Sequence, residues 1–322
     1  MSYLIFGGSG FIGTHLVNLL HEQYPAAKIY NLDIVESNHG GKSTFVHCDV
    51  RKEIELYVPL SAEDVIFNFS AVHRTPGHPD RDYFETNIRG AEHVTDFAEK
   101  HDIRKIVFTS SIAPYGASEE LKEETTLTTP NTPYGISKLV AEKIHGIWQA
   151  KNQQERQLTI VRPGVVFGTG ENGNFTRLYW GIRCRRFFYP GRKDTIKACM
   201  YVKELVRFML YRLEYHQEGV ELYNCTYEPA FTIEQICHAM MGATGLKRRL
   251  VMIPGGLLIG VAAVVGALGG RALGIHPARV KKLMVSTNIS GKKLAASGYK
   301  FHYTFEEAVE DWFKDNERKG LR

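Results

Sequence analysis

The chain has few cysteines, and their arrangement argues against several classes of protein. Its 322 residues include five cysteines, an odd number, and no two have the close spacing of zinc ligands. Reduced thiols in a cytoplasmic protein are the simplest account, and we expect no metal site. The first residues already have a strand pattern, so we also expect no signal peptide.

A strong excess of charge of either sign is also lacking. The 40 basic and 35 acidic residues leave a net charge of +5, with histidines counted as neutral. So modest and dispersed an excess suits an anionic substrate but does not indicate a nucleic-acid partner. The hydrophobic content of 43% over 322 residues allows a large core and predicts a globular protein with two lobes.

A glycine-rich turn stands between a strand pattern and a helix pattern at the start of the chain. Residues 2–6 have the pattern of a short buried strand, and the helix pattern begins after the last glycine of the turn. Gly7 permits a tight turn, Gly10 allows the backbone to approach a pyrophosphate, and Gly13 lets the helix pack closely on the strand. This order predicts a dinucleotide phosphate site at the N-terminus of a helix.

A second strand pattern, residues 28–32, ends at Asp33, twenty residues beyond Gly13. A carboxylate at this spacing can accept hydrogen bonds from a ribose diol, and it would repel a 2′-phosphate. Asp33 therefore favours NAD over NADP as the cofactor. The alternative interpretation is a turn residue that simply follows a strand.

Tyr134 and Lys138 lie four residues apart in a predicted helix. Thr132 is a good N-cap and Pro133 a good first helical residue, so the helix is expected to begin here and to run through Trp148. Residues at this spacing share one face of a helix, and an ammonium beside a phenol favours the phenolate. The pair predicts redox chemistry at a carbon that bears oxygen, with the tyrosine as proton acceptor. An exposed tyrosine and a solvated lysine are the alternative.

Further motifs follow in order along the chain, at residues 66–73, 86–90, 105–116 and 160–168. With the glycine turn and the Tyr134/Lys138 pair, they resemble the extended short-chain dehydrogenases/reductases that act on nucleotide sugars. The resemblance spans most of the chain. It implies an α/β fold, with a Rossmann-type doubly wound parallel sheet and a smaller C-terminal substrate-binding lobe.

The resemblance also implies domain bounds, partners and site residues. The NAD-binding domain would cover residues 1–166, with a return to the sheet near 198–226, and the substrate-binding lobe would cover 167–322. A homodimer is expected. The implied catalytic residues are Ser111, Tyr134 and Lys138. The implied cofactor contacts are Gly7, Gly10, Phe11, Ile12, Gly13, Asp33, Asp49, Val50, Phe69, Ser70, Ala71, His73, Asn87, Ser110, Tyr134, Lys138, Pro163 and Val166. The implied substrate contacts are Asn174, Lys197 and Arg279.

Several of these residues also have a purely structural interpretation. Ser110 and Ser111 can end a strand by bonding local backbone. Asn87 can be a helix cap, and His73 can belong to a solvated loop. The basic and aromatic run at 183–193 can offer cations to a diphosphate, or it can be a solvated helix end with its aromatic rings in the core.

One long stretch has no charge at all. Residues 250–270 contain no charged side chain and are flanked by Lys247–Arg249 and Arg271. This length could span a bilayer, but Pro254 and six glycines argue against a span. We expect a buried or surface helix, or peripheral contact with a membrane, which would be useful for a substrate carried on a membrane lipid.

The expected chemistry follows from the implied site. Tyr134 would take the proton of a sugar hydroxyl held with Ser111, while the hydride passes to C4 of the nicotinamide. In the family resembled here, dehydratases and decarboxylases carry acids after the catalytic serine, whereas this chain has Ile112 and Ala113. The sequence therefore predicts an NAD-dependent nucleotide-sugar epimerase, most simply at C4, in which the hydride returns to the other face.

Two other functions stay open. A reductase or dehydrogenase of a keto sugar or a sterol-like alcohol would use the same residues, and a net change in NADH would identify it. A non-catalytic dinucleotide-sensing protein would tolerate the loss of Ser111, Tyr134 and Lys138.

Overall fold

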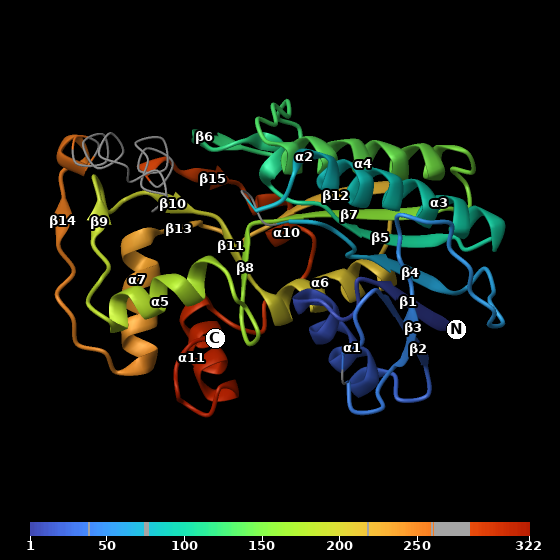
Figure 1. The fold of residues 1–322 in the computed structure, drawn as a ribbon, viewed down its shortest axis with the longest axis horizontal. Helices are drawn as coiled ribbons and strands as arrows, with labels where there is room; N and C mark the ends of the chain where they lie inside the picture. The colour runs from blue at the N-terminus through green and yellow to red at the C-terminus, as the bar shows by residue number, and fades with distance from the viewer. Residues whose placement is uncertain (38, 74–76, 218, 259, 261–283) are drawn as a thin grey trace.

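The computed structural model describes residues 1–37, 39–73, 77–217, 219–258, 260 and 284–322. A parallel seven-stranded sheet in the order β12-β7-β5-β4-β1-β2-β3 forms its centre (Figure 1). The strands are β1 (Ser2–Phe6), β2 (Lys28–Asp33), β3 (Thr44–His47), β4 (Val65–Asn68), β5 (Lys105–Thr109), β7 (Gln157–Pro163) and β12 (Val220–Cys225). The order reverses between β1 and β4, which confirms the predicted doubly wound α/β fold.

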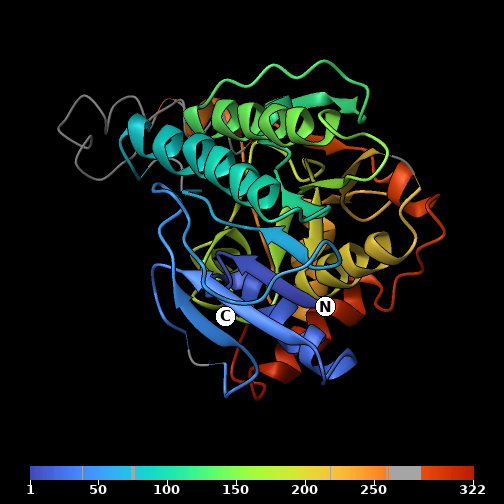
Figure 2. The ribbon, with the colours of Figure 1, turned by 90° about the vertical axis from the view of Figure 1, so that its right-hand side faces the viewer.

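Both faces of the sheet are buried, which explains why its strands are continuous apolar runs. Successive residues of β1 alternate between two cores: Tyr3 and Ile5 pack with α1 (Phe11–Gln23) and α6 (Val202–Glu214). Leu4 and Phe6 face the other core, with α3 (Arg89–Lys100) and α4 (Pro133–Ala150). Figure 2 shows α3 and α4 side by side as one layer over the sheet.

Helix α4 begins where the sequence predicts. The Thr132 Oγ1 accepts a hydrogen bond from the Gly135 backbone N–H at 3.1 Å, and Pro133 is the first helical residue. Before it in the chain, α2 (Asp80–Tyr83) continues through a π-helical turn, η1 (Phe84–Ile88), into α3. Such turns shift the side chains that follow them and recur at functional sites.

The remaining elements form the lobe beyond the carboxyl ends of the sheet strands. Its small sheets consist of β13 (Phe231–Thr232), β10 (Ile196–Lys197), β15 (Thr287–Ile289) and β6 (Ser118–Lys122), of β11 (Cys199–Tyr201) with β8 (Val165–Phe167), and of β14 (Met252–Ile253) with β9 (Tyr189–Pro190). Its helices are η2 (Ala113–Tyr115), α5 (Asn174–Arg183), α7 (Ile233–Thr244) and α11 (Phe305–Asp315). Helix α10 (Lys292–Ala295) packs instead against β12 of the large sheet. An aromatic core that includes Phe167, Phe305 and Trp312 holds this lobe together.

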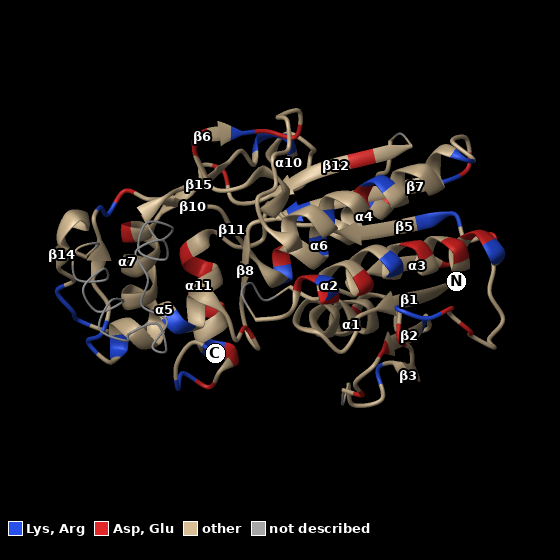
Figure 3. Ribbon diagram, turned by 45° about the horizontal axis from the view of Figure 1, so that its top comes forward, with Lys and Arg blue, Asp and Glu red and all other residues tan. Residues whose placement is uncertain are grey.

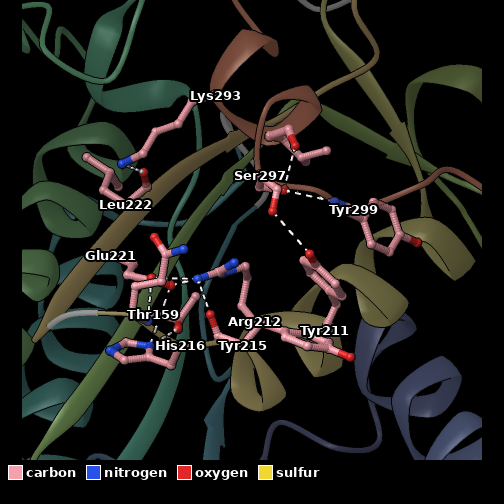
Figure 4. A network of polar contacts seen from close by, with 12 residues as sticks. Thr159, Tyr211, Arg212, Tyr215, His216, Glu221, Leu222, Lys293, Ser297 and Tyr299 are labelled. Atoms are coloured by element: carbon pink, nitrogen blue, oxygen red, sulfur yellow. Dashed lines mark hydrogen bonds and ion pairs between the residues drawn. The ribbon is translucent and has the colours of Figure 1, made fainter.

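A buried ion pair fastens α6 to the edge strand β12. Arg212 donates from Nε and from one terminal nitrogen to the two oxygens of Glu221, at 2.9 and 2.6 Å, and also to the Tyr215 carbonyl (Figure 4). The bidentate geometry offsets part of the desolvation cost of the two charges. The chain thus returns to the first sheet after passing through the second lobe, although the proposed domain bounds themselves stay a prediction.

All five cysteines are free. Within the described ranges, no helix has both the length and the apolar character that a membrane crossing requires.

Candidate active site

The glycines of the turn before α1 allow close backbone contacts that a side chain would prevent. Gly7 has φ +79°, and a Cβ at this position would come within 2.8 Å of the Ser70 backbone nitrogen. A Cβ at Gly13 would come within 2.6 Å of the Gly7 carbonyl oxygen. Gly10 is the N-cap and no side chain caps the helix, so the first N–H groups of α1 stay available for a phosphate.

Asp33 lies at the carboxyl end of β2, beside this turn. Its Oδ2 accepts a hydrogen bond from the Ser9 backbone N–H at 3.1 Å, and its Oδ1 accepts one from the Val35 N–H at 3.2 Å. Each carboxylate oxygen can accept a further bond. The arrangement fits the predicted contact with a ribose diol.

Phe69, Ser70 and Ala71 follow β4 and run alongside the glycine turn. The Phe69 N–H donates to the Phe6 carbonyl at 2.8 Å, which brings this loop against the end of β1. Asn87 holds the loop one residue further on. Its Oδ1 accepts from the Val72 N–H at 2.9 Å, and its Nδ2 donates to the Val72 carbonyl at 3.1 Å and to Ser137 Oγ at 2.8 Å.

The three expected catalytic residues come together between β5 and α4. Ser111 follows β5, and its Oγ accepts from the Ala113 N–H at 3.1 Å. The side chains of Tyr134 and Ser111 share a hydrogen bond. Lys138 is buried one helical turn beyond Tyr134, and its Nζ donates to the Thr109 carbonyl at 2.7 Å.

The titration behaviour of this group differs from the expected one. Burial raises the pKa of Tyr134, and the hydrogen bond with Ser111 opposes that shift. Burial lowers the pKa of Lys138 to about 7, against a smaller opposing effect of Glu142. The expected lowering of the Tyr134 pKa by Lys138 is therefore not found, because desolvation outweighs other effects and Nζ binds the Thr109 carbonyl.

An ion pair beneath α4 was not found by sequence reasoning. Glu142 accepts bidentate bonds from Arg162 at 2.6 and 2.8 Å, and Ser110 Oγ donates to the same carboxylate at 2.5 Å. Arg162 also donates to the Tyr115 hydroxyl at 2.6 Å. The available signal was spacing: Glu142 lies four residues after Lys138, on the face that carries Tyr134.

Gly164 marks a joint between the sheet and the second lobe. It follows Pro163, the last residue of β7, and a Cβ here would come within 2.6 Å of the Ala198 carbonyl oxygen. The Val165 N–H donates to the same carbonyl at 2.9 Å. Lys197 precedes Ala198, and its Nζ donates to the Val285 carbonyl at 2.8 Å. The expected substrate residue Lys197 and the expected cofactor residues Pro163 and Val166 thus meet at one joint.

The remaining expected contacts are more scattered. Asp49 binds Arg51 through both carboxylate oxygens, while Val50 is buried and its carbonyl accepts from His93 Nδ1. Asn174 is the exposed first residue of α5. Phe11 and Ile12 open α1, and Phe11 packs edge-on against the ring of His15. His73 lies in the loop after β4, and Arg279 lies outside the described residues.

The part of the chain that the structure describes contains no group of three or more His, Cys, Asp or Glu residues arranged to hold a metal ion.

The known proteins that resemble this chain include several 4-epimerases. Residues 3–226 match the model of the NAD dependent epimerase/dehydratase family. The N-acetyl-alpha-D-glucosaminyl-diphospho-ditrans,octacis-undecaprenol 4-epimerase of Escherichia coli O157:H7 is 30% identical over 310 residues, which cover 95% of this chain and 92% of that protein. The UDP-glucose 4-epimerase of Halalkalibacterium halodurans is 33% identical over 153 residues, 45% of each chain.

The fold is likewise that of a solved epimerase. The UDP-glucose 4-epimerase of Thermus thermophilus, solved in complex with NAD, superposes with a TM-score of 0.74 over 99% of each chain at 18% identity.

Proposed function

This chain belongs to the NAD dependent epimerase/dehydratase family, and on that premise we propose that it is a 4-epimerase whose substrate is a sugar joined to a diphosphate. The expectation of an NAD-dependent enzyme of the extended short-chain dehydrogenase/reductase type is confirmed. The observation that carries the position of the reaction is the 4-epimerase relative that matches over 95% of the chain.

The residues at the carboxyl ends of β1 and β2 fit NAD. Gly7 lets the turn lie closer to the Ser70 backbone than any other residue could, and the uncapped start of α1 offers N–H groups to a pyrophosphate. Asp33 would take the ribose hydroxyls. When bound there, NAD supplies a hydride acceptor and a positively charged ring.

The proton chemistry falls to Tyr134 and Ser111. Both would hold the hydroxyl of the reacting carbon. Tyr134, as the phenolate that the positively charged ring of bound NAD would favour, would accept the hydroxyl proton as the hydrogen on carbon leaves as hydride to the cofactor, so that a carbonyl forms. The keto sugar would then turn over within the site, so that its opposite face meets the hydride. Tyr134 would give the proton back to oxygen as the hydride returns to that face of the carbon. The centre is inverted, and no cofactor is consumed.

The residues after Ser111 favour this outcome over elimination. A dehydratase needs an acid and a base beside the reacting carbon. Here Ile112 packs with Tyr115, Ala198 and Ile289 in an apolar cluster, and Ala113 contributes no titratable group. The keto sugar is therefore left to take back the hydride.

The group at the other end of the diphosphate, which we call the carrier, can be a nucleoside or a polyprenyl lipid. A nucleotide sugar agrees with the UDP-sugar epimerases among the relatives. A polyprenyl-diphosphate sugar agrees with the relative that covers nearly the whole chain, and with the uncharged run at 250–270. We favour the lipid carrier, because that relative also covers the substrate lobe, whereas the match to the UDP-glucose 4-epimerase covers 45% of this chain.

Purified enzyme that retains NAD should be incubated in parallel with UDP-N-acetylglucosamine and with N-acetylglucosaminyl-diphospho-undecaprenol in detergent. Product NMR should reveal the 4-epimer of the lipid-linked sugar without added cofactor. Substrate deuterated at C4 should give a product that keeps its deuterium. Free NADH in stoichiometric amount would contradict the epimerase and support the dehydrogenase or reductase, and turnover of the UDP-sugar alone would contradict the lipid carrier.

We also propose that the enzyme is a homodimer. Helix α4 exposes Ile136 and Ile147 on the outer side of the α3/α4 layer, and Phe84 of the π-turn is exposed as well. An apolar helix face of this kind fits a second copy across a two-fold axis. Light scattering at micromolar concentration should give twice the mass of the chain, and a monomer would contradict the proposal.

A further inference from the structure

The charge of the chain is distributed very unevenly. Residues 172–193 and 235–305 together carry 16 of the 40 basic residues and none of the 35 acidic ones. The rest of the chain is therefore acidic overall, with 24 basic against 35 acidic residues. A net charge of +5 conceals this separation.

The fold brings exposed cations from both stretches to one end of the second lobe. Phe187, next to Arg186, packs in a cluster with Leu246 and Leu250, which flank Lys247–Arg249. Strand β9 also pairs with β14 directly after these cations. We call the exposed residues Arg183, Arg185, Arg186, Lys247 and Arg249 the basic tip. In Figure 3, Lys and Arg gather around the free end of α5 and the chain that leads to β14.

The cations of the basic tip have no acidic partners among the residues that the structure describes. Arg183 donates only to the Tyr179 hydroxyl and the Lys319 carbonyl. Elsewhere, exposed cations such as Lys100 and Lys151 make ion pairs with nearby carboxylates. Unpaired positive charge at one end leaves a field that attracts an anionic surface.

Apolar side chains are exposed next to these cations. Val251, Met252 and Leu257 are 54%, 49% and 61% exposed, and they follow the basic tip directly in the chain. Cations beside aliphatic side chains are typical of proteins that lie on a membrane surface. A single-stranded nucleic acid would need free aromatic rings for its bases. Phe187 and Phe188 are partly buried, and the guanidinium of Arg183 lies over the ring of the exposed Trp180.

We propose that the basic tip, with Val251, Met252 and Leu257, docks on an anionic phospholipid bilayer. The cations contact the lipid headgroups, and the three aliphatic side chains enter the boundary between headgroups and acyl chains. This inference deepens the proposed function, because a substrate anchored in a bilayer must be reached at its surface. It does not depend on the chemistry of the reaction.

The test is flotation of the full-length, NAD-loaded enzyme with vesicles, in the absence of any sugar. We expect binding to phosphatidylcholine vesicles that contain about 30% phosphatidylglycerol, and little binding to phosphatidylcholine alone. Binding should weaken in about 0.5 M salt, where headgroup and protein charges are screened. Equal binding to both kinds of vesicle, or tighter binding to a DNA or RNA oligonucleotide, would overturn the proposal.

Charge reversal locates the surface. The double variant Arg186→Glu/Arg249→Glu should lose about tenfold or more of its vesicle binding. The matched control Lys28→Glu/Lys100→Glu makes the same charge change on exposed residues of the other lobe, and should bind like the wild type. Retained NAD and an unchanged Tm check that both variants fold. Equal loss in both variants would refute the basic tip as the docking surface.

The outcome is separable from that of the proposed function. An enzyme that turns over only UDP-sugars but floats with anionic vesicles would refute the lipid carrier and leave the docking surface intact. An enzyme that turns over the lipid-linked sugar in detergent but does not bind vesicles would support the lipid carrier and refute the docking surface. The variant Val251→Ser/Leu257→Ser should reduce the binding that persists in high salt, because it removes only the apolar contact.

Discussion

The Asn87 side chain makes two hydrogen bonds to the backbone of Val72. Its Oδ1 accepts from the Val72 N–H at 2.9 Å, and its Nδ2 donates to the Val72 carbonyl at 3.1 Å. The same Nδ2 also donates to Ser137, whose hydroxyl in turn donates to the Tyr134 carbonyl. One amide therefore links the loop after β4, which runs beside the glycine turn, to the helix that carries Tyr134, the proposed proton acceptor. Its polar atoms are engaged within the protein, so we expect Asn87 to act on NAD through Val72.

Asn87→Ala should weaken NAD binding by about tenfold, because the Val72 peptide loses the partners that hold its loop. Fluorescence titration with NAD measures the affinity. Ser137→Ala is the matched control: it breaks only the link to α4 and should leave the affinity within about twofold of the wild type. Equal affinities for NAD in the wild type and in Asn87→Ala would show that Asn87 only stabilises the fold.

Tyr134→Phe should lower turnover by at least about a hundredfold while NAD stays bound, because it removes only the proton acceptor. Product NMR and the NAD content of the purified protein measure the two effects. Lys143→Ala, an exposed residue of the same helix, is the control and should turn over normally. A Tyr134→Phe protein that has lost its NAD would instead indicate a structural tyrosine.

Lys138 should make the stability of the fold depend on pH in a defined direction. Its pKa is about 7 when folded and near 10.5 when unfolded, so between these values the unfolded chain binds more protons and stability rises with pH. Urea unfolding from pH 7 to 10 should show the rise, and Lys138→Met should flatten it.

The control for this pH dependence is His145, whose pKa burial lowers to about 4. His145 affects the free energy of unfolding between pH 4 and 6.5, where stability decreases as the pH decreases. This dependence should persist in Lys138→Met. A Lys138→Met protein with an unchanged slope above pH 7 would refute the assignment.

Asp33→Ala should narrow the gap in affinity between NAD and NADP, since it removes the carboxylate that repels a 2′-phosphate. Parallel titrations with both cofactors measure the gap. Asp49→Ala is the control, because it also removes a carboxylate near a strand end, and it should weaken both cofactors alike. A wild-type protein that already prefers NADP would argue against this role of Asp33.

The parts of the molecule that sequence alone predicts are those with a local cause. The apolar run of β1, the glycines after it and the Thr132 cap of α4 all act over a few residues, and each lies where expected. The hydrogen bonds of Asn87 to Val72 depend on a π-helical turn that no local sequence pattern predicts. The Glu142–Arg162 pair joins a helix to a strand twenty residues away, so only its helical spacing was visible beforehand.

The expected lowering of the Tyr134 pKa is wrong for a physical reason. Spacing put Lys138 on the same helical face as Tyr134, which the structure bears out. Spacing carries no information about burial, and burial both raises the pKa of the phenol and lowers that of the ammonium.

The close backbone contact between Gly164 and Ala198 limits where an enzyme of this fold can change. Two backbones touch there without room for a methyl group, so β7 and the segment that leads from Lys197 into β11 keep a fixed separation. Any residue other than glycine would push these segments apart and displace Lys197 relative to Pro163 and Val166. We therefore expect enzymes of this fold that accept other sugars or carriers to differ in the outer loops of the lobe and to keep a glycine at this position.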